Sequence, residues 1–153
     1  MLNVGDPAPG FTLQNDAGEE VTLSSLRGTP VILYWYPRDD TPGCTTEACG
    51  IRDAWGEFQR AGAAVFGASA DSVKSHATFK AKYNLPFSLL ADPEHQVAEQ
   101  YGVWGEQKVM GIPPFMGVSR VTYLIDENGM IKQVWPKVEP EGHADEILAA
   151  LKQ

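Results

Sequence analysis

The sequence predicts a three-layer α/β domain built on a mixed β-sheet. Segments with strand character alternate with segments of helical periodicity along the 153 residues, as in sheets covered by helices. The strongest strand signal, Val31–Tyr36, runs directly into an amphipathic helix, and the chain closes with two strands joined by a turn and a final helix. No repeat, low-complexity tract or linker divides the chain, so we expect one domain over residues 1–153.

The N-terminal part is predicted to form a β-hairpin that leads into the central strand. Asn15–Gly18 has the composition of a hairpin turn, and Ser24–Gly28 is expected to be a turn or a single helical turn. Gly28 and Pro30 mark the entry to the strand at Val31–Tyr36. The two hairpin strands are expected at Phe11–Gln14 and Glu20–Leu23.

A helix is predicted to start at Thr41 as cap, with Pro42 in the first position, because apolar residues then recur at spacings of three and four. We expect this helix to end near Gly62. Gly102–Gly117 is predicted to be a long functional loop. The remaining elements are expected at Ala63–Ser69 (strand), Asp71 or Ser72 to Tyr83 (helix), Phe87–Leu90 (strand), Pro93–Tyr101 (helix), Val121–Ile125 and Ile131–Trp135 (strands) and Gly142–Lys152 (helix).

Size and charge limit the classes of partner. A chain of 153 residues buries roughly 68–70% of its unfolded surface, enough for a core without metal or disulfide staples. The net charge of −8 argues against a general affinity for nucleic acid or anionic lipid, because binding to either requires a basic surface. No apolar run approaches the ~20 residues of a membrane span, and Met1–Pro7 lacks the features of a signal peptide. We therefore expect a cytoplasmic protein.

The two cysteines, Cys44 and Cys49, both lie in the predicted helix that follows the central strand, where open α/β sheets place ligands. In a reducing compartment, two cysteines five positions apart are redox-active or metal-binding more often than structural. Cys44 falls in the first helical turn, where unpaired N–H groups and the helix dipole favour a thiolate. The alternatives are an inert buried thiol at Cys44 and a small apolar filler at Cys49.

The spacing of the two cysteines constrains how they can react with each other. Five residues along an ideal helix separate two Cα atoms by roughly 8.6 Å, whereas a disulfide requires about 4.4–6.8 Å. We therefore predict that a bond between the two thiols unwinds the first helical turns, which Gly43 and Gly50 make easier.

Other cysteine chemistry fits less well. A thioredoxin-type reductase uses a Cys-x-x-Cys pair, and structural zinc needs about four ligands. The histidines, His76, His95 and His143, are scattered without paired spacing, and we expect each at the surface or at a helix cap. No metal site is predicted.

Thr41–Cys49 reads Thr-Pro-Gly-Cys-Thr-Thr-Glu-Ala-Cys and resembles the peroxidatic motif of peroxiredoxins. The second cysteine, five residues on, is similar to that of the bacterioferritin comigratory protein, or peroxiredoxin Q, subfamily. The resemblance implies a thioredoxin-like fold and a monomeric, atypical 2-Cys thiol peroxidase without cofactor. It extends to Val4–Pro9, Tyr36–Asp40, Tyr101–Gly105 and Arg120–Asp126.

The resemblance also implies roles for individual residues. Cys44 attacks the terminal peroxide oxygen, becomes a sulfenic acid and condenses with Cys49. Thr41 orients the peroxide, Arg120 stabilises the thiolate and the leaving oxygen, and Pro37 shields the thiolate from water. The alternatives are a plain helix cap for Thr41 and an exposed cation for Arg120.

The neighbouring charged residues are open to more than one interpretation. Glu47 either completes a first-turn cap or orients Arg120, and Arg52 pairs with Asp53 or with another surface carboxylate. Asp39 and Asp40 are expected to face solvent, because a carboxylate beside the sulfur opposes the thiolate.

The segment 108–117 departs from the subfamily pattern, which is usually more basic there and lacks the paired prolines. We expect its apolar residues to do one of three things: line a lipid or aromatic hydroperoxide site, cover the core, or contact a partner. The implied activity is reduction of hydrogen peroxide and organic hydroperoxides, with thioredoxin or a similar dithiol protein as reductant. The competing hypotheses are a non-catalytic redox sensor or binding module switched by the same disulfide, and a dithiol reductase without peroxidase activity.

Overall fold

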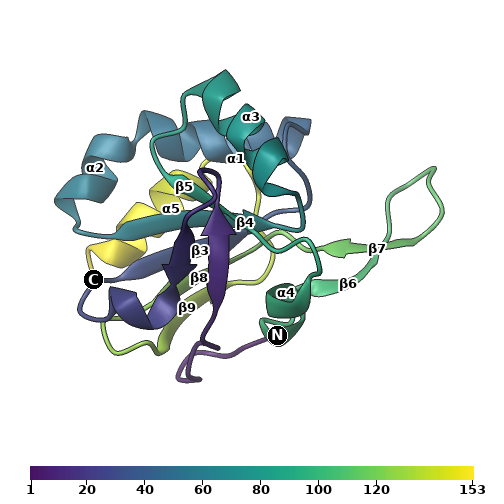
Figure 1. Cartoon of the computed structure of the whole chain (residues 1–153). Helices are drawn as coiled ribbons and strands as arrows, with labels where there is room; N and C mark the ends of the chain where they lie inside the picture. Colours follow the sequence, from purple (N-terminus) through teal and green to yellow (C-terminus); the bar gives the residue numbers. More distant parts are fainter.

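The computed structural model describes residues 1–153 and contains a seven-stranded mixed sheet flanked by helices (Figure 1). The strands are β1 (Thr12–Asn15), β2 (Glu20–Thr22), β3 (Val31–Trp35), β4 (Ala64–Ser69), β5 (Ser88–Ala91), β8 (Val121–Ile125) and β9 (Ile131–Trp135). Their order in the sheet is β2-β1-β5-β4-β3-β8-β9. The central pairs β3–β4 and β4–β5 are parallel, and all other neighbours are antiparallel. The predicted mixed sheet and N-terminal hairpin are confirmed.

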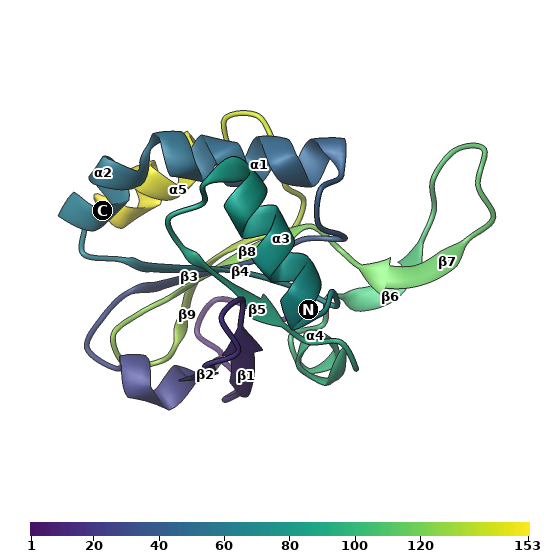
Figure 2. The same ribbon diagram turned by 45° about the horizontal axis from the view of Figure 1, so that its top comes forward.

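Helices cover both faces of this sheet, as Figure 2 shows. One face carries four of them, and the other carries the two shortest segments and the N-terminal chain. None of the helices combines the length and apolar character that a membrane crossing demands. On the first face lie α1 (Pro42–Asp53), α2 (Trp55–Arg60), α3 (Val73–Tyr83) and α5 (His143–Leu151), and on the second lie η1 (Leu23–Leu26) and α4 (Gln96–Gln100).

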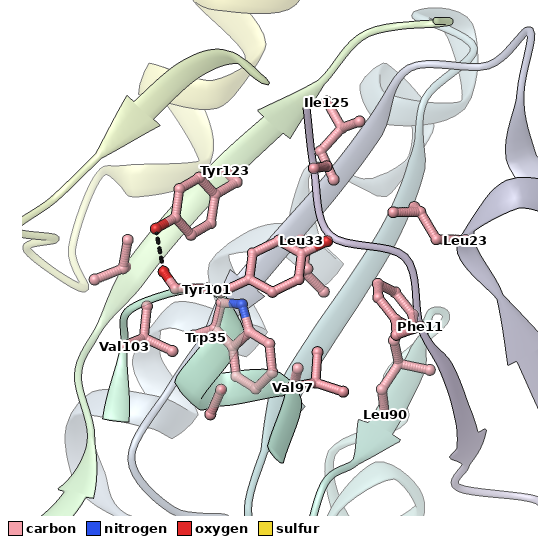
Figure 3. Close-up of a cluster of buried hydrophobic side chains, with 14 of the residues drawn as sticks. Phe11, Leu23, Leu33, Trp35, Leu90, Val97, Tyr101, Val103, Tyr123 and Ile125 are labelled. Atoms are coloured by element: carbon pink, nitrogen blue, oxygen red, sulfur yellow. Dashed lines mark hydrogen bonds between the residues drawn. The ribbon is translucent and has the colours of Figure 1, made fainter. Parts of the chain in front are cut away.

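The central strand β3 divides the core into two clusters. All five of its residues are buried, and successive side chains point to opposite faces because a strand has a period of two. Ile32 and Tyr34 pack beneath α1 and α5, whereas Leu33 and Trp35 pack toward α4. Figure 3 shows the second cluster, which contains few polar atoms. Its rigidity is increased by the Tyr123 hydroxyl, which donates to the Tyr101 carbonyl at 2.6 Å.

The predicted long helix is in fact two helices. Ala54 leaves the helical conformation, with φ −102° and ψ 14°, so α1 ends at Asp53 and α2 starts at Trp55. The break brings the Trp55 ring against Phe58 and Phe87. Apolar spacing did not indicate it, because residues on both sides of the break face the same core.

The segment predicted as a loop at 102–117 is mostly a two-stranded antiparallel ribbon, formed by β6 (Trp104–Gln107) and β7 (Phe115–Val118). It projects from the body of the molecule in both views (Figures 1 and 2). Gly117 keeps the ribbon compact, since a Cβ there would lie 3.3 Å from side-chain carbons of Gln107 and Phe115. The preceding helix is also shorter than predicted, because His95 adopts a left-handed φ of 51°.

Candidate active site

Cys44 lies in the first turn of α1, the helix that follows β3 in the chain. Thr41 is extended, with φ −94° and ψ 155°, and Pro42 occupies the first helical position as predicted. The Cys44 side chain is buried, and both cysteines are free thiols. Unpaired N–H groups and the positive end of the helix dipole therefore surround a thiol that has little contact with water.

Arg120 supplies the cation at this thiol. Its Nη2 donates to Cys44 Sγ at 3.4 Å, and its Nη1 donates to Glu47 Oε1 at 2.9 Å. Antiparallel pairing of β3 and β8 places Val121 opposite Trp35, which brings Arg120 to the strand end that precedes α1. The exposed-cation alternative for Arg120 is wrong. Burial opposes its charge, but interaction with Cys44 and Glu47 raises the pKa of Arg120.

Glu47 pairs with the Arg120 guanidinium and makes no helix-cap hydrogen bond. Its side chain is fully buried and faces Arg120 from one turn further along α1. Burial raises the pKa of Glu47 to about 7, although the nearby Arg120 opposes the shift. The carboxyl therefore ionises near neutrality, and the ion pair becomes complete only as the pH rises above that value.

Gly43 provides the space that Arg120 occupies. A Cβ on this residue would lie 2.9 Å from Arg120 Nη2 and 3.5 Å from Pro140 Cγ. The sequence suggested only that Gly43 weakens the helix, so this close approach is a finding of the structure.

His143, expected at the surface or at a cap, is instead fully buried behind Glu47. Its Nε2 lies 2.8 Å from Thr122 Oγ1 and 4.0 Å from Glu47 Oε2, while its Nδ1 lies 3.1 Å from Glu146 Oε1. Burial lowers the pKa of His143, which favours the neutral ring beside Glu47. Hydrophobic spacing carries no signal for such a residue, because it identifies apolar and not polar positions in a core.

Thr41 and Pro37 lie on the segment that leads from β3 into α1. The Thr41 hydroxyl donates to the Arg38 carbonyl at 3.0 Å and makes no cap hydrogen bond, so the plain-cap alternative is wrong. Pro37 is exposed. Both residues line a groove of about 600 Å³, whose other wall is largely the β6–β7 ribbon. The apolar lining of the ribbon side consists of Trp104, Val109, Ile112, Phe115, Met116 and Val118.

Cys49 lies one and a half turns further along α1 and is partly exposed. It lines a second, polar pocket of about 390 Å³ between α1 and the segment before α5. Arg52, close by, bonds to Asp53 at 3.0 Å, as predicted, and also to the Tyr83 carbonyl at 2.8 Å. Solvent thus reaches Cys49 while Cys44 is enclosed.

The two aspartates before the site differ from each other. Asp40 is exposed as predicted and bonds to Lys82 at 2.7 Å. Asp39 is not exposed: its side chain is 4% accessible and lies 2.7 Å from the buried His76. The expectations of a solvent-facing Asp39 and a surface His76 are therefore wrong. His95 is partly exposed, and its ring stacks on Trp104 with centroids 3.8 Å apart.

Comparison with known proteins shows the family to which the chain belongs. The model of the AhpC/TSA family matches residues 4–134. The chain is 53% identical over 150 residues to a putative peroxiredoxin bcp of Coxiella burnetii, covering 98% of this chain and 99% of that protein. The chain belongs to the AhpC/TSA family of peroxiredoxins. It is also 43% identical over 152 residues to peroxiredoxin Bcp of Escherichia coli strain K12, covering 99% and 97% of the two chains.

Solved peroxiredoxin structures share the fold. Xanthomonas campestris peroxiredoxin Q matches with a TM-score of 0.87 at 39% identity, covering 93% of this chain and 89% of that chain. A Xylella fastidiosa PrxQ mutant matches with a TM-score of 0.92 at 33% identity, covering 99% and 96%. The predicted thioredoxin-like fold and the resemblance to the peroxiredoxin Q subfamily are confirmed.

Alanine at position 43 is expected to push the guanidinium away from the sulfur, because Glu47 already holds Arg120 on its other side. The rate at which Cys44 reacts with hydrogen peroxide should fall roughly tenfold to a hundredfold, the effect of losing one charge-assisted hydrogen bond. Stopped-flow tryptophan fluorescence measures this rate. Gly10→Ala is the control, since nothing lies within 4 Å of a Cβ there. A folded Gly43→Ala protein with the wild-type rate would contradict this role for Gly43.

Glu47 is expected to make the protein less stable as the pH rises from about 4.5 to about 7. In that range the unfolded chain has an ionised carboxyl and the folded chain a protonated one, so the free energy of unfolding should decrease by about 3 kcal/mol. Glu47→Gln should remove this decrease. Urea unfolding at both ends of the range measures it, with the exposed Glu57→Gln as control. Equal pH dependence in wild type and Glu47→Gln would refute the assignment.

Proposed function

We propose that Cys44 is the peroxidatic residue and Cys49 the resolving residue of a thiol peroxidase that reduces hydrogen peroxide and organic hydroperoxides. The observation that carries this proposal is the Arg120 guanidinium 3.4 Å from the buried Cys44 sulfur at a helix N-terminus, in a chain of the peroxiredoxin family. Positive charge at that point stabilises a thiolate, which is the nucleophilic form of cysteine.

In the first step the Cys44 thiolate attacks the terminal oxygen of the hydroperoxide. The S–O bond forms as the O–O bond breaks, its electron pair leaves on the second oxygen, and that oxygen takes a proton to leave as water or alcohol. The sulfur is oxidised to a sulfenic acid. Arg120 stabilises the negative charge on the leaving oxygen. Thr41, whose hydrogen is donated to Arg38, accepts the O–H of the peroxide, and Pro37 limits access of water.

In the second step the Cys49 thiol attacks the sulfenic sulfur. The S–S bond forms, the S–O bond breaks, and the oxygen leaves as water with the Cys49 proton and the sulfenic hydrogen. Both thiols lie in α1, where ideal geometry holds their Cα atoms roughly 8.6 Å apart, so the first turns of α1 must unwind. A dithiol protein such as thioredoxin then returns two electrons by thiol exchange, and we therefore propose a reducing compartment, the cytoplasm, for the enzyme.

The groove beside Thr41 and Pro37 supports organic hydroperoxides as substrates. Its apolar lining removes an alkyl or aromatic group from water while the peroxide end reaches the site entrance. A structure of the Xanthomonas campestris bacterioferritin comigratory protein, 39% identical to this chain, was described in terms of that protein's alkyl peroxide reduction activity. Both reacting thiols belong to one helix, so we also propose that the monomer is active.

Peroxide consumption with and without a thioredoxin system tests the proposal. Wild-type protein should consume hydrogen peroxide and cumene hydroperoxide repeatedly, while Cys44→Ser should consume neither. Cys49→Ser should undergo the first oxidation and then lose thioredoxin-driven turnover. One slow stoichiometric oxidation of the wild type would favour the redox-sensor hypothesis, and disulfide reduction without peroxide consumption would favour a dithiol reductase.

Strengthening α1 should slow the second step. Gly50 is helical and has nothing within 4 Å of an added Cβ, so Gly50→Ala stabilises the helix by about 1 kcal/mol. Disulfide formation should slow about fivefold, with the first oxidation unchanged. Gly56→Ala in α2 is the matched control and should leave both rates unchanged. An unaltered disulfide rate in Gly50→Ala would argue against unwinding.

A further inference from the structure

A buried polar cluster joins the chain just before Cys44 to α3. It consists of the Asp39 carboxylate and the side chains that surround it, and it takes no part in the reaction described above. We call this cluster the clasp; its members are Tyr36, Asp39, Ser75 and His76.

Both carboxylate oxygens and the backbone N–H of Asp39 have hydrogen-bond partners. Oδ1 accepts from the Tyr36 hydroxyl at 2.6 Å, and Oδ2 accepts from the Ser75 hydroxyl at 2.8 Å. The Asp39 backbone N–H donates to Asp71 Oδ2 at 2.9 Å, and Asp71 is itself held by the Ser69 hydroxyl at 2.6 Å. The main chain of Asp39 is therefore held by the turn between β4 and α3, and its side chain by α3 and by Tyr36.

His76 closes the clasp from inside the core. Its Nε2 lies 2.9 Å from the Leu90 carbonyl oxygen, which only accepts, so Nε2 carries a proton. Its Nδ1 lies 2.7 Å from Asp39 Oδ2, within hydrogen-bond distance. His76 is fully buried and Asp39 nearly so. The ligand atoms of Asp39, Asp71 and His76 lie within 4.8 Å of one another, but both ring nitrogens are already engaged, so the group is a hydrogen-bond network.

The contacts on either side of the clasp are weaker or more distant. Asp40 bonds to Lys82 and to the Tyr83 hydroxyl, both at 2.7 Å, but these groups are exposed and contribute little. The far end of α1 is held to α3 by Arg52, which donates to the Tyr83 carbonyl. Segment 40–51, which carries both thiols, is thus joined to α3 at two points, of which the clasp is the buried one.

We propose that the clasp is a positioning device that sets how often the first turn of α1 opens, and so divides the Cys44 sulfenic acid between two fates. This inference rests on the proposed function. In the open state the Cys49 thiol displaces the sulfenic oxygen as water and forms the S–S bond. In the closed state a second hydroperoxide transfers one oxygen to the sulfur, giving a sulfinic acid and one alcohol or water.

Weakening the clasp favours disulfide formation over oxidation to sulfinic acid. Removing one partner of a buried hydrogen-bonded pair leaves the other unsatisfied in the closed state, whereas water satisfies it when the segment opens. The open state therefore becomes more populated. As long as the closed state predominates, the first oxidation of Cys44 keeps its rate while disulfide formation accelerates.

The test compares wild type, His76→Asn and Lys82→Ala. After a pulse of hydrogen peroxide, stopped-flow fluorescence gives the rates of Cys44 oxidation and of disulfide formation, and mass spectrometry gives the sulfinic fraction at rising peroxide. His76→Asn should accelerate disulfide formation on the order of tenfold or more and raise the peroxide concentration for half conversion to sulfinic acid by the same factor. Lys82→Ala, which cuts only the exposed contact, should match wild type.

Amide hydrogen exchange separates positioning from general destabilisation. In His76→Asn, exchange should accelerate in residues 38–50 and stay unchanged in β3 and β8. Two results for His76→Asn would overturn this proposal: amide exchange that accelerates uniformly over the whole chain, or disulfide and sulfinic acid yields equal to those of the wild type. If His76→Asn does not fold, Ser75→Ala removes one bond to Asp39 and must show the same changes at smaller size. Wild-type protein that forms no Cys44–Cys49 bond would overturn the proposed function itself, whereas normal wild-type behaviour with unresponsive variants would overturn only the clasp.

Discussion

The helical geometry of α1 governs everything else at this site. While the helix is intact, its first turn presents N–H groups and a positive dipole to Cys44, and it carries Glu47 at the distance needed to hold Arg120. The same geometry keeps Cys49 too far from Cys44 for a disulfide. In the proposed reaction, activation of Cys44 and attack by Cys49 therefore require different conformations of α1.

A positive charge lies next to the Cys44 sulfur even though the protein as a whole is acidic. The chain carries a net charge of −8, yet the Arg120 guanidinium lies 3.4 Å from the Cys44 sulfur, and Asp39 contacts His76 instead. Burial is what gives these pairs their strength, because the surrounding protein screens charge much less than water does. Gly43 contributes by lacking the methyl group that would separate the guanidinium from the sulfur.

Much of the fold followed from the sequence, because apolar periodicity and turn residues report directly on strands and helix starts. The break at Ala54 did not, since residues on both sides face one core. The role of Arg120 was predicted only from the resemblance to a known family. Arg120 and Cys44 are 76 positions apart in the sequence, and only strand pairing brings them together. The buried His76, His143 and Asp39 were missed, because polar residues look alike in a sequence whether they are solvated or satisfied inside a core.

The central claim is that the first turns of α1 unwind when Cys44 and Cys49 join. Amide hydrogen exchange of residues 41–50, measured in the reduced protein and in the protein carrying the Cys44–Cys49 disulfide, tests it most directly. The account predicts strong protection in the reduced form and its loss over this segment in the disulfide form, with β3 and β8 unchanged. A disulfide form that keeps the reduced protein's helix content and protection would contradict it.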